Sequence, residues 1–176
     1  MITGERIFIV AGAFIALLLQ ILVVPHMALF GGMAMPNMLV IFVMLVAVSR
    51  PGQFGPVLPF VLGLVFDFVG GGPVGAMAFS LTVFSMAVSA IIVRSNNDSA
   101  FVALVLLALG LLLVELSYGA FLMLFGYRVD LLGALAYRIV PCFLYDVVVA
   151  AVLYPIASRF LQAGGGASLG GFATLR

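Results

Sequence analysis

The sequence predicts an all-α membrane protein with six transmembrane helices. Of its 176 residues, 66% are hydrophobic and 7% are charged, and the mean hydropathy is +1.40. In an ordinary soluble domain, about 25% of the residues are charged. Seven basic and six acidic side chains are too few to cover a soluble protein of this size. Disorder is excluded as well, because disordered chains combine low hydrophobicity with high charge.

Several functional classes are excluded by the residue types present. The net charge is +1, whereas nucleic-acid-binding domains carry a basic face, so no nucleic-acid partner is expected. Cys142 and His26 are the single cysteine and histidine. A disulfide framework, a cysteine-based metal site and a multi-histidine metal site are therefore excluded. We expect neither a metal ion nor another cofactor.

The predicted spans follow the apolar runs, since a membrane helix needs roughly 20 apolar residues. Six runs qualify: residues 7–24, 37–49, 55–69, 74–93, 100–125 and 131–161. The second and third are short for a full crossing, and Pro141 and Pro155 predict kinks or breaks in the last. Residues 1–161 are thus expected to form one transmembrane domain. The glycine-rich residues 162–176 are expected to form a flexible cytoplasmic tail.

The arginines predict the orientation, because cytoplasmic loops carry an excess of basic residues. With six spans, a cytoplasmic N-terminus places most arginines inside and leaves Arg128 outside. The inner set is Arg6, Arg50, Arg94, Arg159 and Arg176. We therefore expect a multi-pass membrane protein with both termini in the cytoplasm. A cleaved signal peptide is the competing interpretation of the first run, but the run is long and Pro25-His26 is a poor cleavage site.

Four ionisable residues interrupt the predicted spans, where such groups are costly. Asp67, Glu115 and Arg138 are expected to meet in the outer half of the membrane. Arg138 is expected to pair with Glu115 or Asp67. The pair would fix helix register, or it would belong to a proton or substrate relay. Asp146 is expected to lie alone nearer the inner half, so a continuous relay is not evident.

Two stripes of small or hydroxyl residues mark faces where helices can approach closely. Each stripe is either an internal packing seam, which we favour, or a docking face for another protein's helix. The stripes are Gly12, Ala16 and Gln20 in the first run, and Ala78, Thr82, Ser85 and Ser89 in the fourth.

The turn between the third and fourth runs holds a distinctive set of residues. Asp67 shares a helical face with Gly63, four residues earlier. Glycines 70–72 allow unusual backbone angles, Pro73 suits the first turn of the next helix, and Gly75 is expected to keep that helix start slim. Asp67 would accept hydrogen bonds from the N–H groups of this helix start. A structural cap is the interpretation we favour, and a ligand site is the alternative.

Taken in order, these residues resemble a known family. The pattern runs from residues 16–20, ALLLQ, through Pro25, Pro36-Asn37 and Arg50-Pro51 to Gly63, Asp67, Gly71, Pro73, Gly75 and Ala78. This order and spacing resemble the rod shape-determining protein MreD family. The resemblance covers about residues 16–90, and the second half of the chain matches only as apolar spans.

The resemblance implies a non-enzymatic part of the machinery that inserts lateral-wall peptidoglycan. The implied partners are MreC above all, then MreB, RodA and the elongation transpeptidase, together with membrane lipids. It also implies a fold similar to the substrate-binding membrane component of energy-coupling-factor transporters. The motif positions carried over are Gln20, Asn37, Asp67, Gly71, Pro73 and Gly75. The candidate structural or partner-binding residues are these six together with Gly63, Glu115 and Arg138. MreC is expected to dock on a small-residue face.

The alternative functional classes are a transporter component and a membrane enzyme. A transporter component would bind a vitamin-sized molecule in an outer-half pocket lined by aromatic and hydrogen-bonding groups. Tryptophan is absent, and the expected outer loops have few polar side chains, which count against such a pocket. A membrane enzyme would need a reactive cluster that the sequence does not offer, so no catalytic residue is expected.

Overall fold

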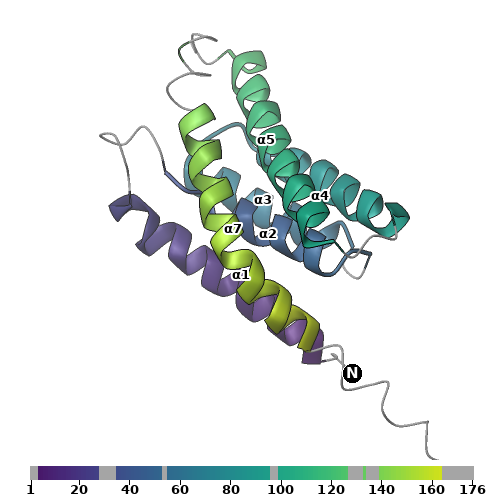
Figure 1. Cartoon of the computed structure of the whole chain (residues 1–176). Helices are drawn as coiled ribbons and strands as arrows, with labels where there is room; N and C mark the ends of the chain where they lie inside the picture. Colours follow the sequence, from purple (N-terminus) through teal and green to yellow (C-terminus); the bar gives the residue numbers. More distant parts are fainter. Residues whose placement is uncertain are drawn as a thin grey trace, which may run out of the picture.

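The computed structural model is all-helical, as the sequence predicts (Figure 1). It describes residues 4–27, 35–52, 55–95, 99–126, 133 and 139–163. The elements in chain order are α1 (Gly4–Leu22), the 3₁₀ turn η1 (Val24–His26), α2 (Met38–Ser49), α3 (Val57–Gly70), α4 (Ala76–Ser95), α5 (Ala100–Leu124) and α7 (Val140–Ala163). The predicted tail beyond Ala163 lies outside the described residues.

Four segments of the described chain are long and apolar enough to cross a membrane: Ile9–His26, Ala76–Ser95, Ala100–Leu124 and Val140–Arg159. They confirm four of the six predicted spans by length and composition. The other two helices, α2 and α3, have 12 and 14 residues. At 1.5 Å per residue they extend about 18 and 21 Å, less than the hydrocarbon thickness of about 30 Å. A full crossing by α2 or α3 is therefore not confirmed.

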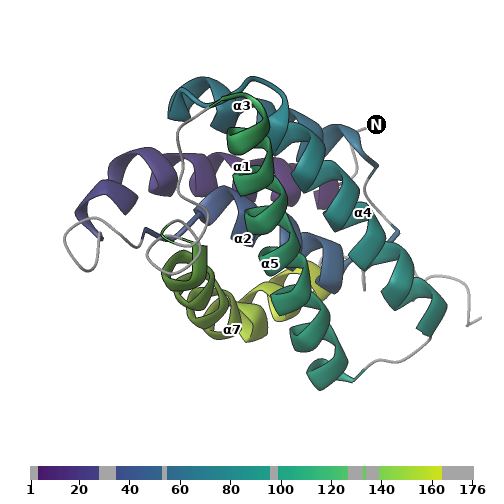
Figure 2. The same cartoon turned by 90° about the horizontal axis from the view of Figure 1, so that it is seen from above.

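The short helix α2 forms the centre of the bundle. All its residues except Phe42 and Ser49 are buried. It packs against α1, α3, α4, α5 and α7, and Figure 2 shows it in the middle of the other helices. A helix that is apolar all round suits this position, because every face meets another helix.

The helix α3 packs mainly on α4, with which it forms an antiparallel hairpin. Gly63 makes the close contact possible. A Cβ atom at this position would lie 2.5 Å from the Cα atom of Ala78 and 2.7 Å from its backbone nitrogen. Since these atoms belong to backbone, they cannot move aside, so the hairpin requires glycine at position 63.

The helix α1 packs mainly on α2 through the predicted small-residue stripe. Ala13 and Ala16 are buried in this seam. A Cβ atom at Gly12 would lie 2.7 Å from the ring of Phe42. The stripe in α4 is internal too, since Ala78, Ser85 and Ser89 are buried. The interpretation of both stripes as packing seams is thus confirmed.

Replacing Gly12 by leucine should weaken the seam between α1 and α2. The added side chain overlaps the Phe42 ring, and overpacking typically costs about 1–3 kcal/mol. We expect a lower melting temperature for the detergent-purified protein. Ala11→Leu is the matched control, because Ala11 is exposed on the same helix. An equal loss in both variants would contradict this account of the seam.

The helix α7 begins nine residues later than the run predicted from residue 131. Pro141 therefore lies in its first turn, where proline is tolerated, and Pro155 lies inside the helix. Pro155 has no N–H group to donate to the preceding turn. The late start of α7 also changes the position of Asp146, as described below.

Candidate functional site

The start of α2 is held by side chains from two other helices. The first N–H groups of a helix have no partner within it, and lipid offers none. Asp146 Oδ1 in α7 accepts a hydrogen bond from the Asn37 N–H at 2.8 Å. Gln20 Oε1 in α1 accepts one from the Met38 N–H at 2.7 Å. The Asn37 side chain accepts a third from the Val40 N–H at 3.4 Å, so α1, α2 and α7 are joined here.

The start of α4 is held by Asp67 near the end of α3. This side chain is 1% exposed. Its Oδ2 accepts hydrogen bonds from the N–H groups of Gly75 at 2.8 Å and Ala78 at 3.3 Å. Its Oδ1 accepts one from the Met77 N–H at 3.1 Å. The hydrogen bonds predicted for a cap across this turn are therefore present, and the negative charge suits the positive end of the helix dipole.

The turn before α4 needs glycine at two positions. Gly71 ends α3 in the left-handed conformation, with φ of 65°. Gly75 has φ of 96°, which brings its N–H to Asp67. The expected reason for Gly75, a slim helix start, is wrong, because nothing lies within 4 Å of where its Cβ would be. Pro73 precedes α4 by three residues instead of opening it.

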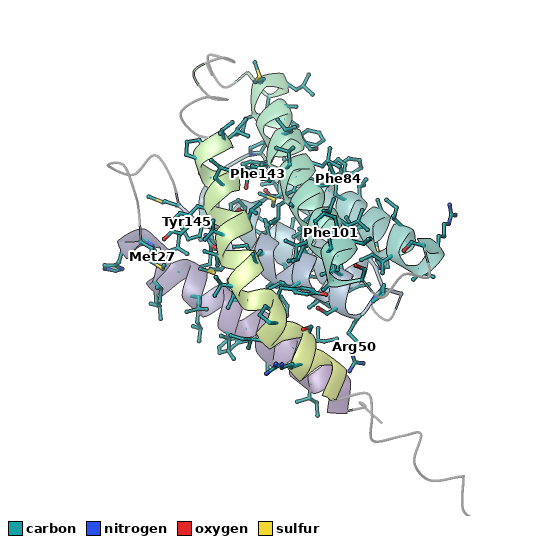
Figure 3. All side chains as sticks on the ribbon, in the orientation of Figure 1. Met27, Arg50, Phe84, Phe101, Phe143 and Tyr145 are labelled. Atoms are coloured by element: carbon teal, nitrogen blue, oxygen red, sulfur yellow. The ribbon has the colours of Figure 1, made fainter. Side chains whose placement is uncertain are left out.

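Both caps belong to one end of the bundle, where α1, α3 and α5 end and α2, α4 and α7 begin. The Tyr118 hydroxyl near the end of α5 packs against Gly72 in the α3–α4 turn. Tyr145 near the start of α7 reaches the Met27 carbonyl after α1, at 3.5 Å. Figure 3 shows Tyr145 and Met27 at the opposite end of the molecule from Arg50. We call this end, defined by Gln20, Asn37, Asp67 and Asp146, the capped end.

The expectation that Asp146 lies alone is wrong, because it lies at the capped end and bonds to Asn37. Its expected place nearer the inner half depends on the orientation in the membrane and stays a prediction. Because α7 begins at Val140, Asp146 falls in its second turn and not in its middle. Glu115 lies in α5, a helix that packs against α7. Arg138, the expected partner of Glu115 or Asp67, lies outside the described residues, so the predicted ion pair stays a prediction.

The bond between Asp146 and the start of α2 is not among the contacts predicted from the sequence. The need for such an acceptor was predictable, because a helix that starts within an apolar chain needs acceptors for its first N–H groups. The contact between the Ser80 and Ser117 hydroxyls, 2.9 Å apart, was missed as well. It joins α4 to α5 next to the α4 start. Serine hydroxyls inside membrane bundles commonly make such contacts between helices.

The chemistry of the capped end is that of helix positioning. The side-chain acceptors of Gln20, Asn37, Asp67 and Asp146 bond to backbone N–H groups. They tie α1 and α7 to the start of α2, and α3 to the start of α4. Within the described parts of the chain, no three His, Cys, Asp or Glu residues gather as a metal site.

Comparison with known proteins then identifies the family. A family model for the rod shape-determining protein MreD matches residues 3–163. No curated protein matches the chain, and no solved structure does, so the expected likeness to energy-coupling-factor transporters stays a prediction. Because the family match covers nearly the whole chain, this membrane protein belongs to the rod shape-determining protein MreD family.

Proposed function

We propose that this chain is a non-catalytic membrane component of the bacterial elongation machinery, which regulates lateral peptidoglycan synthesis by binding MreC. The match to the MreD family over residues 3–163 carries the proposal, since that family determines rod shape. Association with the cell-shape machinery follows from the family. The choice of MreC as direct partner, and of MreB, RodA and the elongation transpeptidase as further partners, is part of the proposal.

The use of the polar side chains supports a structural role. The side chains of Asp67, Gln20 and Asn37 accept hydrogen bonds from backbone N–H groups of this chain. They hold two helix starts in place, and a precisely held bundle is what a docking partner requires. Turnover of a substrate would instead need groups aimed at a reacting atom.

The arrangement of the arginines supports the proposed orientation. Arg50 and Arg94 end α2 and α4, and Arg159 lies in the last five residues of α7. All three therefore lie at the end opposite the capped end. Under the positive-inside rule, this arginine-bearing end lies on the cytoplasmic side of the bacterial inner membrane. The capped end then faces outward, toward the side on which peptidoglycan is built.

The helices leave large apolar faces for lipid and for a partner's membrane helix. Phe14 on α1, Phe60 on α3 and Phe101 on α5 are all exposed. Membrane helices associate by van der Waals packing and hydrogen bonds instead of by exclusion from water. An exposed apolar face in this protein is therefore compatible with both lipid and a helix of MreC.

A photo-cross-linking experiment tests the partner. A photoreactive phenylalanine analogue placed singly at Phe14, Phe60 and Phe101 samples three faces of the bundle. We expect a covalent adduct with co-expressed MreC from at least one face, and no adduct when MreC is omitted. Folded protein that gives no MreC adduct from any face, and no co-purification in detergent, would contradict MreC binding.

Depletion of this chain in its rod-shaped host tests the wider role. We expect cells to round up, and re-expression to restore the rod. Rods that persist after depletion would argue against a role in elongation.

A further inference from the structure

Asp146 is buried in a way that leaves half of its carboxylate without a partner. Its side chain is 0% exposed. Oδ1 accepts the hydrogen bond from the Asn37 N–H at 2.8 Å. Oδ2 is buried and has no hydrogen-bond partner. Asp67 differs from Asp146 in this respect, because both of its carboxylate oxygens accept hydrogen bonds.

The described charges around Asp146 do not neutralise it. The helices packed against α7 are α2 and α5. In α5 the charged residue is Glu115, which is an acid like Asp146 and supplies no positive charge. The charged residue flanking α2 is Arg50, 13 residues beyond Asn37 and therefore about 20 Å along the helix. Arg159, in α7 itself, is 13 residues from Asp146, at a similar distance.

The other described side chains that form hydrogen bonds at this junction are amides and a phenol. Gln20 from α1 contributes an amide that bonds to Met38. Tyr145, next to Asp146 in sequence, directs its hydroxyl to the Met27 carbonyl. Burial of an uncompensated carboxylate is costly. Among the residues that the structure describes, none therefore places a positive charge next to Asp146 Oδ2 at the junction of α1, α2 and α7.

We propose that Asp146 Oδ2 is a binding site for a small monovalent cation, which is either a proton or a sodium ion. Bound there, the cation neutralises the buried carboxylate and leaves Oδ1 free to hold the start of α2. Cation binding is thereby coupled to the packing of α1, α2 and α7. The site is separate from the proposed binding of MreC and does not depend on it.

Two measurements on the full-length protein in detergent distinguish the two cations. If a proton is bound, the infrared spectrum at neutral pH contains the C=O stretch of a protonated carboxyl group. Asp146→Asn removes this band. If sodium is bound, the melting temperature rises with NaCl but not with choline chloride at equal ionic strength, and Asp146→Asn abolishes the rise. Asp98→Asn, which removes an acid located between α4 and α5 in the sequence, is the matched control and keeps either signal.

The folding of the variant gives a third readout. Asparagine keeps a carbonyl oxygen for the Asn37 N–H and is neutral, so it mimics the cation-bound carboxylate. We expect Asp146→Asn to accumulate in membranes at the wild-type level.

Three results would overturn the proposal. One is the absence of both the carboxyl band and the sodium effect in the wild-type protein. Another is the persistence of either signal in Asp146→Asn. The third is a carboxyl band that appears only in Arg138→Gln, because the positive charge would then come from this arginine of the chain.

Discussion

The Gly63→Ala variant is expected to accumulate in the membrane at a small fraction of the wild-type level. The new methyl group would lie 2.5–2.9 Å from three backbone atoms of Met77 and Ala78. Relief of this overlap requires α3 and α4 to separate, which also pulls Asp67 from the N–H groups it caps. Overpacking alone costs about 1–3 kcal/mol, and the lost cap adds to it. Immunoblots of membrane fractions and melting in detergent measure the effect.

Gly70→Ala is the matched control on the same helix. A Cβ atom there would meet only the Phe66 ring, at an ordinary 3.8 Å. Alanine also favours a helix over glycine by roughly 0.5–1 kcal/mol. Gly70→Ala should therefore be at least as abundant as the wild type. If Gly63→Ala is equally abundant, the close packing of α3 on α4 is not required.

Asp67→Ala is expected to have the second large effect. The substitution removes the acceptors of three N–H groups, those of Gly75, Met77 and Ala78. Each buried donor left unsatisfied costs about 1–3 kcal/mol, against a total stability of about 5–15 kcal/mol for a typical protein. We expect membrane abundance and melting temperature to fall sharply, and rod shape to be lost with them.

Asp67→Asn refines this test, because asparagine keeps one acceptor oxygen and loses the other. Its abundance should lie between those of Asp67→Ala and the wild type. A different outcome would change the interpretation of the site. If Asp67→Ala stays abundant but no longer supports rod shape, Asp67 contacts a ligand or partner, and its role as a cap is secondary.

The α3–α4 turn could be predicted from the sequence because its interactions are local. Asp67 and Gly75 are eight residues apart and lie on either side of one turn. Helix periodicity alone places Gly63 and Asp67 on the same face. The conformation of Gly75 was not predictable in this way, since glycine in a turn serves either a close contact or a positive φ, and only coordinates distinguish the two.

The start of α2 shows what local reasoning misses. Asp146 and Asn37 are 109 residues apart, so their contact depends on how α7 packs against α2. The position of Asp146 also depended on where α7 begins. Residues 131–161 form one apolar run, and hydrophobicity gives no sign that the helix starts at Val140. For that reason the sequence predicts Asp146 in the middle of a helix, whereas it lies in the second turn of α7.

The amino-acid sequence was enough to predict that this protein belongs to the membrane, that it is all-helical and, except at the start of α7, roughly where its helices begin and end. Those properties follow from composition and from short-range periodicity, which lipid makes decisive because backbone groups must be satisfied within helices. The packing of the helices was needed to see that a 12-residue helix occupies the centre, and that side chains from α1 and α7 hold its start. Those features depend on which helices pack together, and many arrangements satisfy the same apolar pattern.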